Sequence, residues 1–145
     1  MSKIIRLKNR IKTFNNEIYI PGDKSLSIRW VLFSSLANGV STAKNLLMSE
    51  DVLAAIEAIK CLGIKVIIKK NICKIYGNGI NGFKYKRNLI IDAKNSGTLG
   101  RLILGLLVNS PYSIKLIGDE SLSKRDFKRI SDPLSKFGAK FKLKK

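Results

Sequence analysis

Histidine is absent from this chain of 145 residues. The sequence therefore lacks the side chain that most often acts as a general base near neutral pH and most often binds a transition metal. Any catalysis falls to Lys, Arg, Asp, Glu or Ser. Cysteine is scarce as well, because the chain has only Cys61 and Cys73, and neither belongs to a Cys-x-x-Cys pair. Each lies in an apolar pattern, so we expect buried free thiols rather than a redox or metal site.

Long hydrophobic runs are also missing. The longest, residues 102–108, is far below the roughly 20 residues that a membrane-spanning helix needs. Residues 1–6 show neither a sustained apolar stretch nor a small-residue cleavage site of the kind that marks a secretory signal. We therefore expect a cytoplasmic protein with no membrane partner. Hydrophobic residues make up 45% of the chain, which is typical of a globular domain.

Acidic residues are few, and 10 Asp and Glu against 28 Lys and Arg leave a net charge of +18. This excess favours an anionic partner. The basic residues are spread through segments 3–12, 65–74, 84–87 and 136–145, and a bias toward Lys, Ile and Asn often reflects the base composition of a genome. We therefore do not expect nucleic-acid binding. The alternative is a basic, non-catalytic anion- or nucleic-acid-binding module, whose affinity would fall steeply with salt and survive Lys24→Ala.

The most informative stretch is Pro-Gly-Asp-Lys-Ser-Leu-Ser-Ile-Arg at 21–29. It follows a predicted strand at 17–20, and the helical pattern that starts at Ser25 makes it a strand-to-helix turn. A helix start leaves four backbone amides without intrahelical partners and carries a partial positive charge, to which Lys24 and Arg29 add full charges. Such a turn can hold a phosphate. The alternative is that Ser25 only caps the helix while both cations are solvated.

The order of predicted elements repeats along the chain. The sequence predicts strand 17–20, helix 25–37, strand 41–47, helix 49–62 and strands 65–69 and 72–76, then strand 89–93, helix 99–108, strand 112–117, helix 127–137 and strand 139–143. We interpret them as two copies of a β-α-β-α-β-β unit, about 17–80 and about 87–145, the second cut short. Residues 1–16 form a leading arm with a strand at 4–7. The first helix is apolar on most of its circumference, which predicts heavy burial. The second helix opens with Glu50 and Asp51, where the helix dipole favours carboxylates, and it carries a one-sided apolar stripe of Val52, Ala55, Ile56, Ile59 and Leu62.

Two further polar turns occur in the second copy. Asn-Ser-Gly-Thr at 95–98 enters a helix that carries Arg101, and the loop from Gly118 to Ser121 precedes a helix and leads to Arg125. If the copies pack alike, the two strand-to-helix turns lie at the same end of the fold. The alternatives are an ordinary helix cap at 95–98 and a solvated loop at 118–125.

Taken together, the three motifs resemble a known family. Residues 21–29, Asn-Ser-Gly-Thr-x-x-Arg at 95–101 and Gly-Asp-x-Ser-Leu-x-x-Arg at 118–125 are similar to those of 5-enolpyruvylshikimate-3-phosphate synthases, the 3-phosphoshikimate 1-carboxyvinyltransferases. The related transferases that act on a nucleotide sugar have Lys-Asn in place of Lys24-Ser25 and a catalytic cysteine loop that this chain lacks. The resemblance implies an α/β fold, an incomplete inside-out α/β barrel domain with buried helices behind a mixed sheet, and an arm 1–16 that belongs with a second domain.

The resemblance also implies substrates. Lys24 would be the catalytic residue and would contact both substrates, while Ser25 and Arg29 would join it in holding shikimate 3-phosphate. The reaction would add the 5-hydroxyl of that substrate to C2 of phosphoenolpyruvate and then release phosphate. Both substrates are polyanions, which suits a cluster of cations at helix starts. No metal and no organic cofactor is implied, and the family is monomeric, although association of this chain would cover edges that its length leaves open.

For phosphoenolpyruvate, the implied binding residues besides Lys24 are Asn95, Gly97 and Arg125. Thr98 and Arg101 would support them. A glycine at position 97 allows a ligand to approach the backbone closely.

The sequence departs from the family pattern in three ways. Asp126 replaces the usual proline and places a carboxylate beside Arg125, where it is expected to weaken that arginine as a ligand. Ile28 and Gly100 stand where the family more often has a polar residue and a methionine. The chain is also about a third of the usual length. We therefore expect the N-terminal portion of such an enzyme, whether a gene fragment or half of a split protein, to carry half of a site and to be inactive alone.

Overall fold

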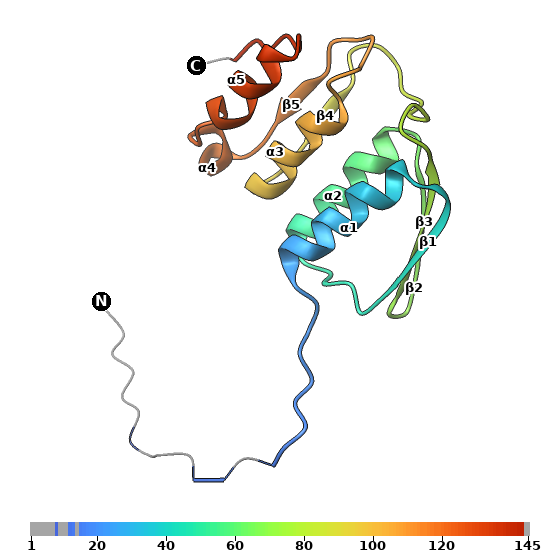
Figure 1. The fold of residues 1–145 in the computed structure, drawn as a ribbon, viewed down its shortest axis with the longest axis vertical. Helices are drawn as coiled ribbons and strands as arrows, with labels where there is room; N and C mark the ends of the chain where they lie inside the picture. Colours follow the sequence, from blue (N-terminus) through green and yellow to red (C-terminus); the bar gives the residue numbers. More distant parts are fainter. Residues whose placement is uncertain (1–7, 9–11, 14, 144–145) are drawn as a thin grey trace.

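Two α/β units follow one another in the computed structural model, which describes residues 8, 12–13 and 15–143 (Figure 1). The first unit comprises α1 (Lys24–Leu36), β1 (Asn38–Lys44), α2 (Glu50–Cys61), β2 (Lys65–Lys69) and β3 (Ile72–Asn78). The second comprises β4 (Ile90–Asp92), α3 (Gly97–Leu106), β5 (Lys115–Ile117), α4 (Glu120–Ser123) and α5 (Lys128–Lys136). The predicted α/β class is confirmed, and the helix and strand order within 24–136 follows the prediction closely.

The two units have different sheets. In the first, β3 lies between β1 and β2 and pairs antiparallel with both. In the second, β4 and β5 pair in parallel, with α3 as the connection between them. Neither sheet closes into a barrel, which agrees with the expectation of an incomplete barrel domain.

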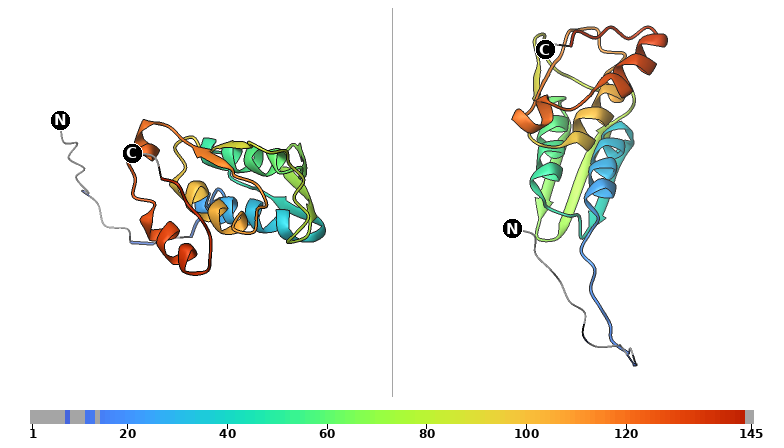
Figure 2. Two further views of the ribbon diagram at one scale, coloured as in Figure 1. Left: turned by 90° about the horizontal axis from the view of Figure 1, so that it is seen from above. Right: turned by 90° about the vertical axis from the view of Figure 1, so that its left-hand side faces the viewer.

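The core lies between the first sheet and the helices. Figure 2 shows α1 and α2 side by side on one face of the β1-β3-β2 sheet, with α3 next to them. The predicted one-sided stripe of the second helix is confirmed: Val52, Ala55, Ile56 and Ile59 of α2 and Leu62 at its C-cap are buried, whereas Leu53 is 42% exposed. Leu99 and Ile103 of α3 belong to the same cluster, so a single core joins the two units.

Helix α1 is buried on one side only, so the prediction of burial around most of its circumference is wrong. Leu26 is 66% exposed and Phe33 is 65% exposed. The buried side combines Ile28, Val31 and Leu32 with small serines. This side packs closely because β3 has a glycine, Gly77, directly under the end of the helix. Small residues on both surfaces allow the helix to approach the sheet.

Three predicted strands have a different outcome. Residues 17–20 and 139–143 form no strand, because no other strand among the described residues pairs with them. The side chains of the first segment are therefore open to solvent, with Ile18, Tyr19 and Ile20 at least 67% exposed. The strand expected at 4–7 lies outside the described residues.

The details at the C-terminal side differ as well. The loop expected at 118–121 turns into the short helix α4 at Glu120. Pro133 lies inside α5, which begins at Lys128. The prediction of two buried thiols is right for Cys73 and wrong for Cys61, which is exposed in the last turn of α2. Burial raises the pKa of the Cys73 thiol.

In the part of the chain that the structure describes, no helix combines the length and the apolar character needed to cross a membrane.

The close contact between α1 and β3 gives a stability prediction. A methyl group at position 77 would collide with the carbonyl oxygens of Ser34 and Ala37, whereas one at Gly105, on the open side of α3, meets nothing within 4 Å. Gly77→Ala should therefore lower the free energy of unfolding by about 1–3 kcal/mol. Gly105→Ala should leave it unchanged or raise it by up to about 1 kcal/mol, because alanine is the better helix former. Urea denaturation of both variants tests this, and an equal effect of the two would contradict the packing described.

Candidate functional site

An open hollow of about 390 Å³ lies where the first turn of α2 faces the β4–α3 and β5–α4 turns. Its lining contains four carboxylates and one lysine among eight residues: Glu50, Asp51, Asp92, Lys94, Asn95, Ile117, Gly118 and Asp119. The motifs at 95–101 and 118–125 therefore meet in space. The motif at 21–29 reaches the same hollow through an ion pair.

Lys24 is the first residue of α1, and its ammonium lies 2.8 Å from Asp51 Oδ2. The lysine side chain is 53% exposed, while that of Asp51 is 20% exposed. Asp51 lines the hollow from the first turn of α2, so it holds the ammonium at the rim. The α1 cap is Asp23, which accepts a hydrogen bond of 2.6 Å from the Leu26 amide. The alternative of Ser25 as the cap is thus wrong, because Ser25 is already inside the helix.

Asn95 connects the second and third motifs. Its Nδ2 donates a hydrogen bond of 2.6 Å to Asp119 Oδ2, and its Oδ1 accepts one of 3.2 Å from Arg125 Nη2. Asp119 also caps α4, because its Oδ1 accepts from the Leu122 amide at 2.7 Å. One carboxylate therefore fixes both the start of α4 and the orientation of the Asn95 amide, which in turn positions Arg125.

Gly97 is the first residue of α3, and guanidinium groups lie directly over it. A Cβ at this position would be 2.5 Å from Nη1 of Arg125 and 3.3 Å from Nη1 of Arg101. Ser96 caps the helix, with its Oγ accepting from the Leu99 amide at 3.3 Å. Two full positive charges therefore stand at a helix N-terminus whose dipole also favours an anion. The absence of a side chain at Gly97 is what makes this arrangement possible.

Arg101 contacts two residues that follow Arg125 in the chain, Asp126 and Phe127. Its Nη2 donates to the Asp126 carbonyl oxygen at 3.3 Å, and its guanidinium lies 5.7 Å from the centre of the Phe127 ring. Its Nε is buried and has no hydrogen-bond partner among the described residues. The same ring explains Gly100, because a Cβ there would already be 3.3 Å from Phe127 Cζ. A longer side chain at position 100 would displace Phe127 and, with it, Arg101.

The remaining predicted site residues are Ser25, Arg29 and Thr98. Ser25 and Thr98 are half-buried, and Arg29 is exposed. Within residues 15–143, no hydrogen bond or ion pair connects their side chains to the group around Asn95. The structure thus brings together Asn95, Gly97, Arg101 and Arg125, and joins Lys24 to them across the hollow through Asp51.

Sequence reasoning missed the carboxylates that position these cations. Asp51 was expected only as a favourable charge at a helix start, and Asp119 only as part of a loop. The available signal was the position of Asp119 three residues before Leu122, a typical cap spacing. No sequence pattern indicated that Lys24 would pair with Asp51, because the two residues belong to different helices.

Three of the four carboxylates that line the hollow have a cationic or hydrogen-bonding partner: Asp51, Asp92 and Asp119. Hydrogen bonds from the Leu122 amide and the Asn95 side chain, and the nearby charge of Arg125, lower the pKa of Asp119. The side-chain and backbone hydrogen bonds from Lys94 lower the pKa of Asp92, and the pKa of Lys94 is raised in turn. These two residues form an ion pair of 2.7 Å. Such pairing reduces the repulsion that an anionic ligand would meet in the hollow.

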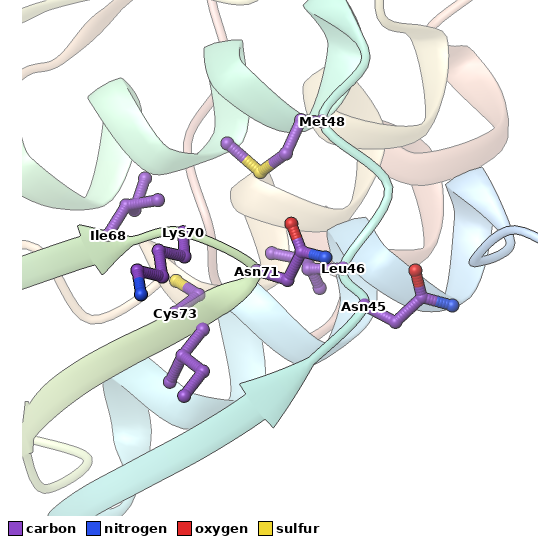
Figure 3. Close-up of a pocket in the computed structure, with 8 residues that line it drawn as sticks. Asn45, Leu46, Met48, Ile68, Lys70, Asn71 and Cys73 are labelled. Carbon is purple, nitrogen blue, oxygen red and sulfur yellow. The ribbon is translucent and has the colours of Figure 1, made fainter.

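A second hollow, of about 50 Å³, lies between the β2–β3 turn and the segment after β1 (Figure 3). It is lined by Asn45, Leu46, Met48, Ile68, Lys70, Asn71, Ile72 and Cys73. None of the predicted site residues borders it. It has room for little more than a water molecule or two, and we assign it no role.

Comparison with known proteins identifies the family to which the chain belongs. The family model for EPSP synthase (3-phosphoshikimate 1-carboxyvinyltransferase) matches residues 8–145. The chain belongs to the EPSP synthase family. A 3-phosphoshikimate 1-carboxyvinyltransferase of Bacillus subtilis is 41% identical over 133 residues, and one of Streptococcus agalactiae is 42% identical over 136 residues. These alignments cover 92% and 94% of this chain.

Solved structures of the EPSP synthase family share the fold. EPSP synthase from Acinetobacter baumannii superposes with a TM-score of 0.79 at 35% sequence identity, over 85% of this chain and 28% of that one. The chain spans 31% of the length of the Bacillus subtilis relative and 32% of the Streptococcus agalactiae relative.

The substitution of Asp126 for the proline usual in EPSP synthases has a structural explanation. Its Oδ1 accepts from the Lys128 amide at 2.8 Å, so the carboxylate satisfies the first turn of α5. In the part of the chain that is described, no ion pair within 4 Å joins it to Arg125. The expected weakening of Arg125 by direct contact with this carboxylate is therefore not found.

The hydrogen bonds to Asp119 predict how stability depends on pH. Because the pKa of Asp119 is lowered in the folded state, its contribution is fully present above its unfolded-state pKa of about 3.9 and is lost as pH falls through the lower folded-state value. Asp119→Asn should therefore have a lower melting temperature than the wild type at pH 7, and this difference should shrink below about pH 4.

Thermal melts followed by circular dichroism between neutral pH and about pH 3 check this prediction. Glu120→Gln is the matched control, because it removes the adjacent carboxylate, whose ion-pair partner among the described residues is Lys124 at the end of α4. A difference between wild type and Asp119→Asn that stays constant down to about pH 3, or an equal response of the control, would contradict the role given to Asp119.

Proposed function

We propose that this chain forms one wall of the active site for enolpyruvyl transfer from phosphoenolpyruvate to the 5-hydroxyl of shikimate 3-phosphate, with release of phosphate. This is the step of the shikimate pathway that leads to chorismate and the aromatic amino acids. The observation that carries the proposal is the pair of guanidinium groups over Gly97. Asn95 and Asp119 orient that of Arg125, and the ammonium of Lys24 lies at the rim of the same hollow through its ion pair with Asp51. Family membership supports it, because relatives that share these motifs bear the name of that activity.

Phosphoenolpyruvate is assigned to the start of α3. Its anionic groups would lie between the α3 amides and Arg125, with Asn95 offering a side-chain amide and Lys24 a further charge. Bidentate contacts from arginine and backbone amides at a helix start are strong, specific ligands for phosphate. Thr98 and Arg101 support this group, the latter from its position against Phe127.

Shikimate 3-phosphate is assigned to the start of α1. Ser25 and Arg29 are four residues apart in the helix and therefore lie on the same face, one turn from each other. Arg29 is exposed and Ser25 half-buried, so both are open to a ligand. Lys24 begins the same helix, and its ammonium pairs with Asp51 at the hollow that Asn95 also lines, which suits a residue that contacts both substrates.

The proposed chemistry needs charge stabilisation and positioning rather than a metal or an organic cofactor. The 5-hydroxyl gives up its proton as its oxygen forms a bond to C2 of phosphoenolpyruvate and C3 gains a proton. The C2–O bond to phosphate then breaks as C3 loses a proton, which restores the C2=C3 double bond. Lys24 and Arg125 would stabilise the negative charge of the substrates and of the leaving phosphate through both steps. In this chain, Asp51 and Asn95 hold these two cations in place.

The chain corresponds to about a third of its relatives, so we assign the remaining substrate contacts to the part of the family fold outside these 145 residues. On this proposal, units 17–80 and 87–145 belong to the first domain, and arm 1–16 belongs with the second. The enzyme would be a cytoplasmic monomer, and association of the isolated chain would cover its open edges.

The proposal predicts weak binding without turnover. The isolated chain should bind shikimate 3-phosphate weakly, and Lys24→Ala and Arg29→Ala should each abolish that binding, because both remove charge-assisted contacts to the phosphate. Lys86→Ala is the matched control, since Lys86 is an exposed lysine outside the site. Isothermal titration calorimetry measures the binding, and phosphate release from phosphoenolpyruvate measures turnover.

In a complete enzyme that carries this segment, each of the two site substitutions should cost about 2–4 kcal/mol of transition-state stabilisation. Full activity of Lys24→Ala in that enzyme would refute the role of Lys24. Phosphate release by the isolated chain would refute the assignment of essential groups to residues outside it.

A further inference from the structure

The outer face of the β1-β3-β2 sheet carries four lysines, of which three lie within segment 65–74 and one, Lys44, lies on β1. Because residues paired across antiparallel strands share a face, the register defines three rows on this side of the sheet. The rows are Lys44–Ile72–Lys69, Thr42–Lys74–Ile67 and Val40–Tyr76–Lys65. None of the three strands contains a carboxylate. We call this side of the sheet the lysine face.

The lysine face is open. The alternate residues of β3, namely Cys73, Ile75 and Gly77, are buried against the helices, so Lys74 and Tyr76 point the other way. In Figures 1 and 2, no described element lies beyond the sheet on this side. Ion pairs within 4 Å among the described residues involve Lys24, Lys60, Lys94 and Lys124, and none involves a lysine of this face. No carboxylate among the described residues therefore neutralises the four lysines of this face.

The face also offers flat apolar surface between the charges. The ammonium of Lys65 lies 5.0 Å from the centre of the Tyr76 ring, a cation–π contact that orients the ring on the sheet. Ile72 lies between Lys44 and Lys69, which are two strand spacings apart, about 10 Å. Val40, 56% exposed, lies beside Tyr76 on the next strand. On this face, lysines flank an aromatic ring and aliphatic side chains. Such a surface suits a ligand that combines a negatively charged backbone with flat groups that can stack on the ring.

We propose that the lysine face binds single-stranded nucleic acid without sequence preference, through its phosphates to the four lysines and through a base on Tyr76. Single strands are bound in this way by positively charged surfaces with exposed aromatic side chains. An acidic peptide would use the charges and leave the ring and the aliphatic side chains without a matching group. An anionic membrane would find too little apolar surface, because every row carries at least one lysine. This site is separate from the hollow around Asn95 and does not depend on the proposed function.

Fluorescence anisotropy with labelled single-stranded RNA of about 12 nucleotides tests the proposal on the full chain, between about 50 and 200 mM salt. Lys69→Gln/Lys74→Gln should weaken binding at least tenfold. It should also reduce the slope of log K against log salt by about 1.4, since each phosphate contact on a single strand contributes about 0.7. The matched control is Lys140→Gln/Lys142→Gln, which removes the same charge beyond α5, away from the sheet. It should change affinity less than twofold.

Tyr76→Leu separates stacking from charge. It should weaken binding several-fold and leave the salt slope unchanged, and a duplex of the same length should bind more weakly than the single strand because its bases are not available. Lys24→Ala should bind like the wild type. The proposal is overturned if both double variants lose affinity equally, if Lys24→Ala abolishes binding, or if the duplex binds as tightly as the single strand. Equal displacement by an acidic peptide of the same charge, or binding only to anionic vesicles, would also overturn it.

Discussion

The carboxylate of Asp119 joins elements of the second unit that are 24 residues apart in the chain. One of its oxygens satisfies an amide at the start of α4, and the other orients the side chain of Asn95. Because the carboxamide of Asn95 can point in only one direction when its amino group is held there, its oxygen faces Arg125. The position of a guanidinium over the start of α3 thus depends on a helix cap. The geometry of the candidate site therefore depends on the N-cap hydrogen bond that begins α4.

A second consequence concerns charge. A chain with a net charge of +18 could hold anions almost anywhere, yet four of the chain's 10 carboxylates line this hollow. Three of them position other groups: Asp51, Asp92 and Asp119. Each has a cationic or hydrogen-bonding partner, so these acids position the cations and leave little net repulsion toward a ligand. Lys24 and Arg125 are thereby held before any ligand arrives. Such pre-organisation lowers the entropic cost of binding and is what electrostatic catalysis requires.

The sequence predicted correctly those helices, strands and turns that local residue patterns determine. The stripe on α2, the turn at Asn95 and the strands at 65–69 and 72–76 follow from periodicity and turn residues, and the structure confirms them. The predictions from sequence were wrong where the structure of a segment depends on contacts with a distant part of the chain. Residues 17–20 have a strand pattern without a partner strand among the described residues, and Leu26 and Phe33 are apolar residues on a side of α1 that nothing described covers. The Lys24–Asp51 pair and the lysine face depend on how elements meet, which a linear pattern does not contain.

The central claim is that the start of α3, with Arg125 held over Gly97 by Asn95 and Asp119, is an anion site for phosphoenolpyruvate. The most direct measurement is a titration of the isotopically labelled chain with phosphoenolpyruvate, followed by the backbone amide resonances in two-dimensional NMR. The account predicts saturable shifts that are largest at Gly97 and Thr98 and that disappear in Arg125→Gln. Shifts spread evenly over the lysine-rich surface, or shifts at Gly97 that persist in Arg125→Gln, would contradict it.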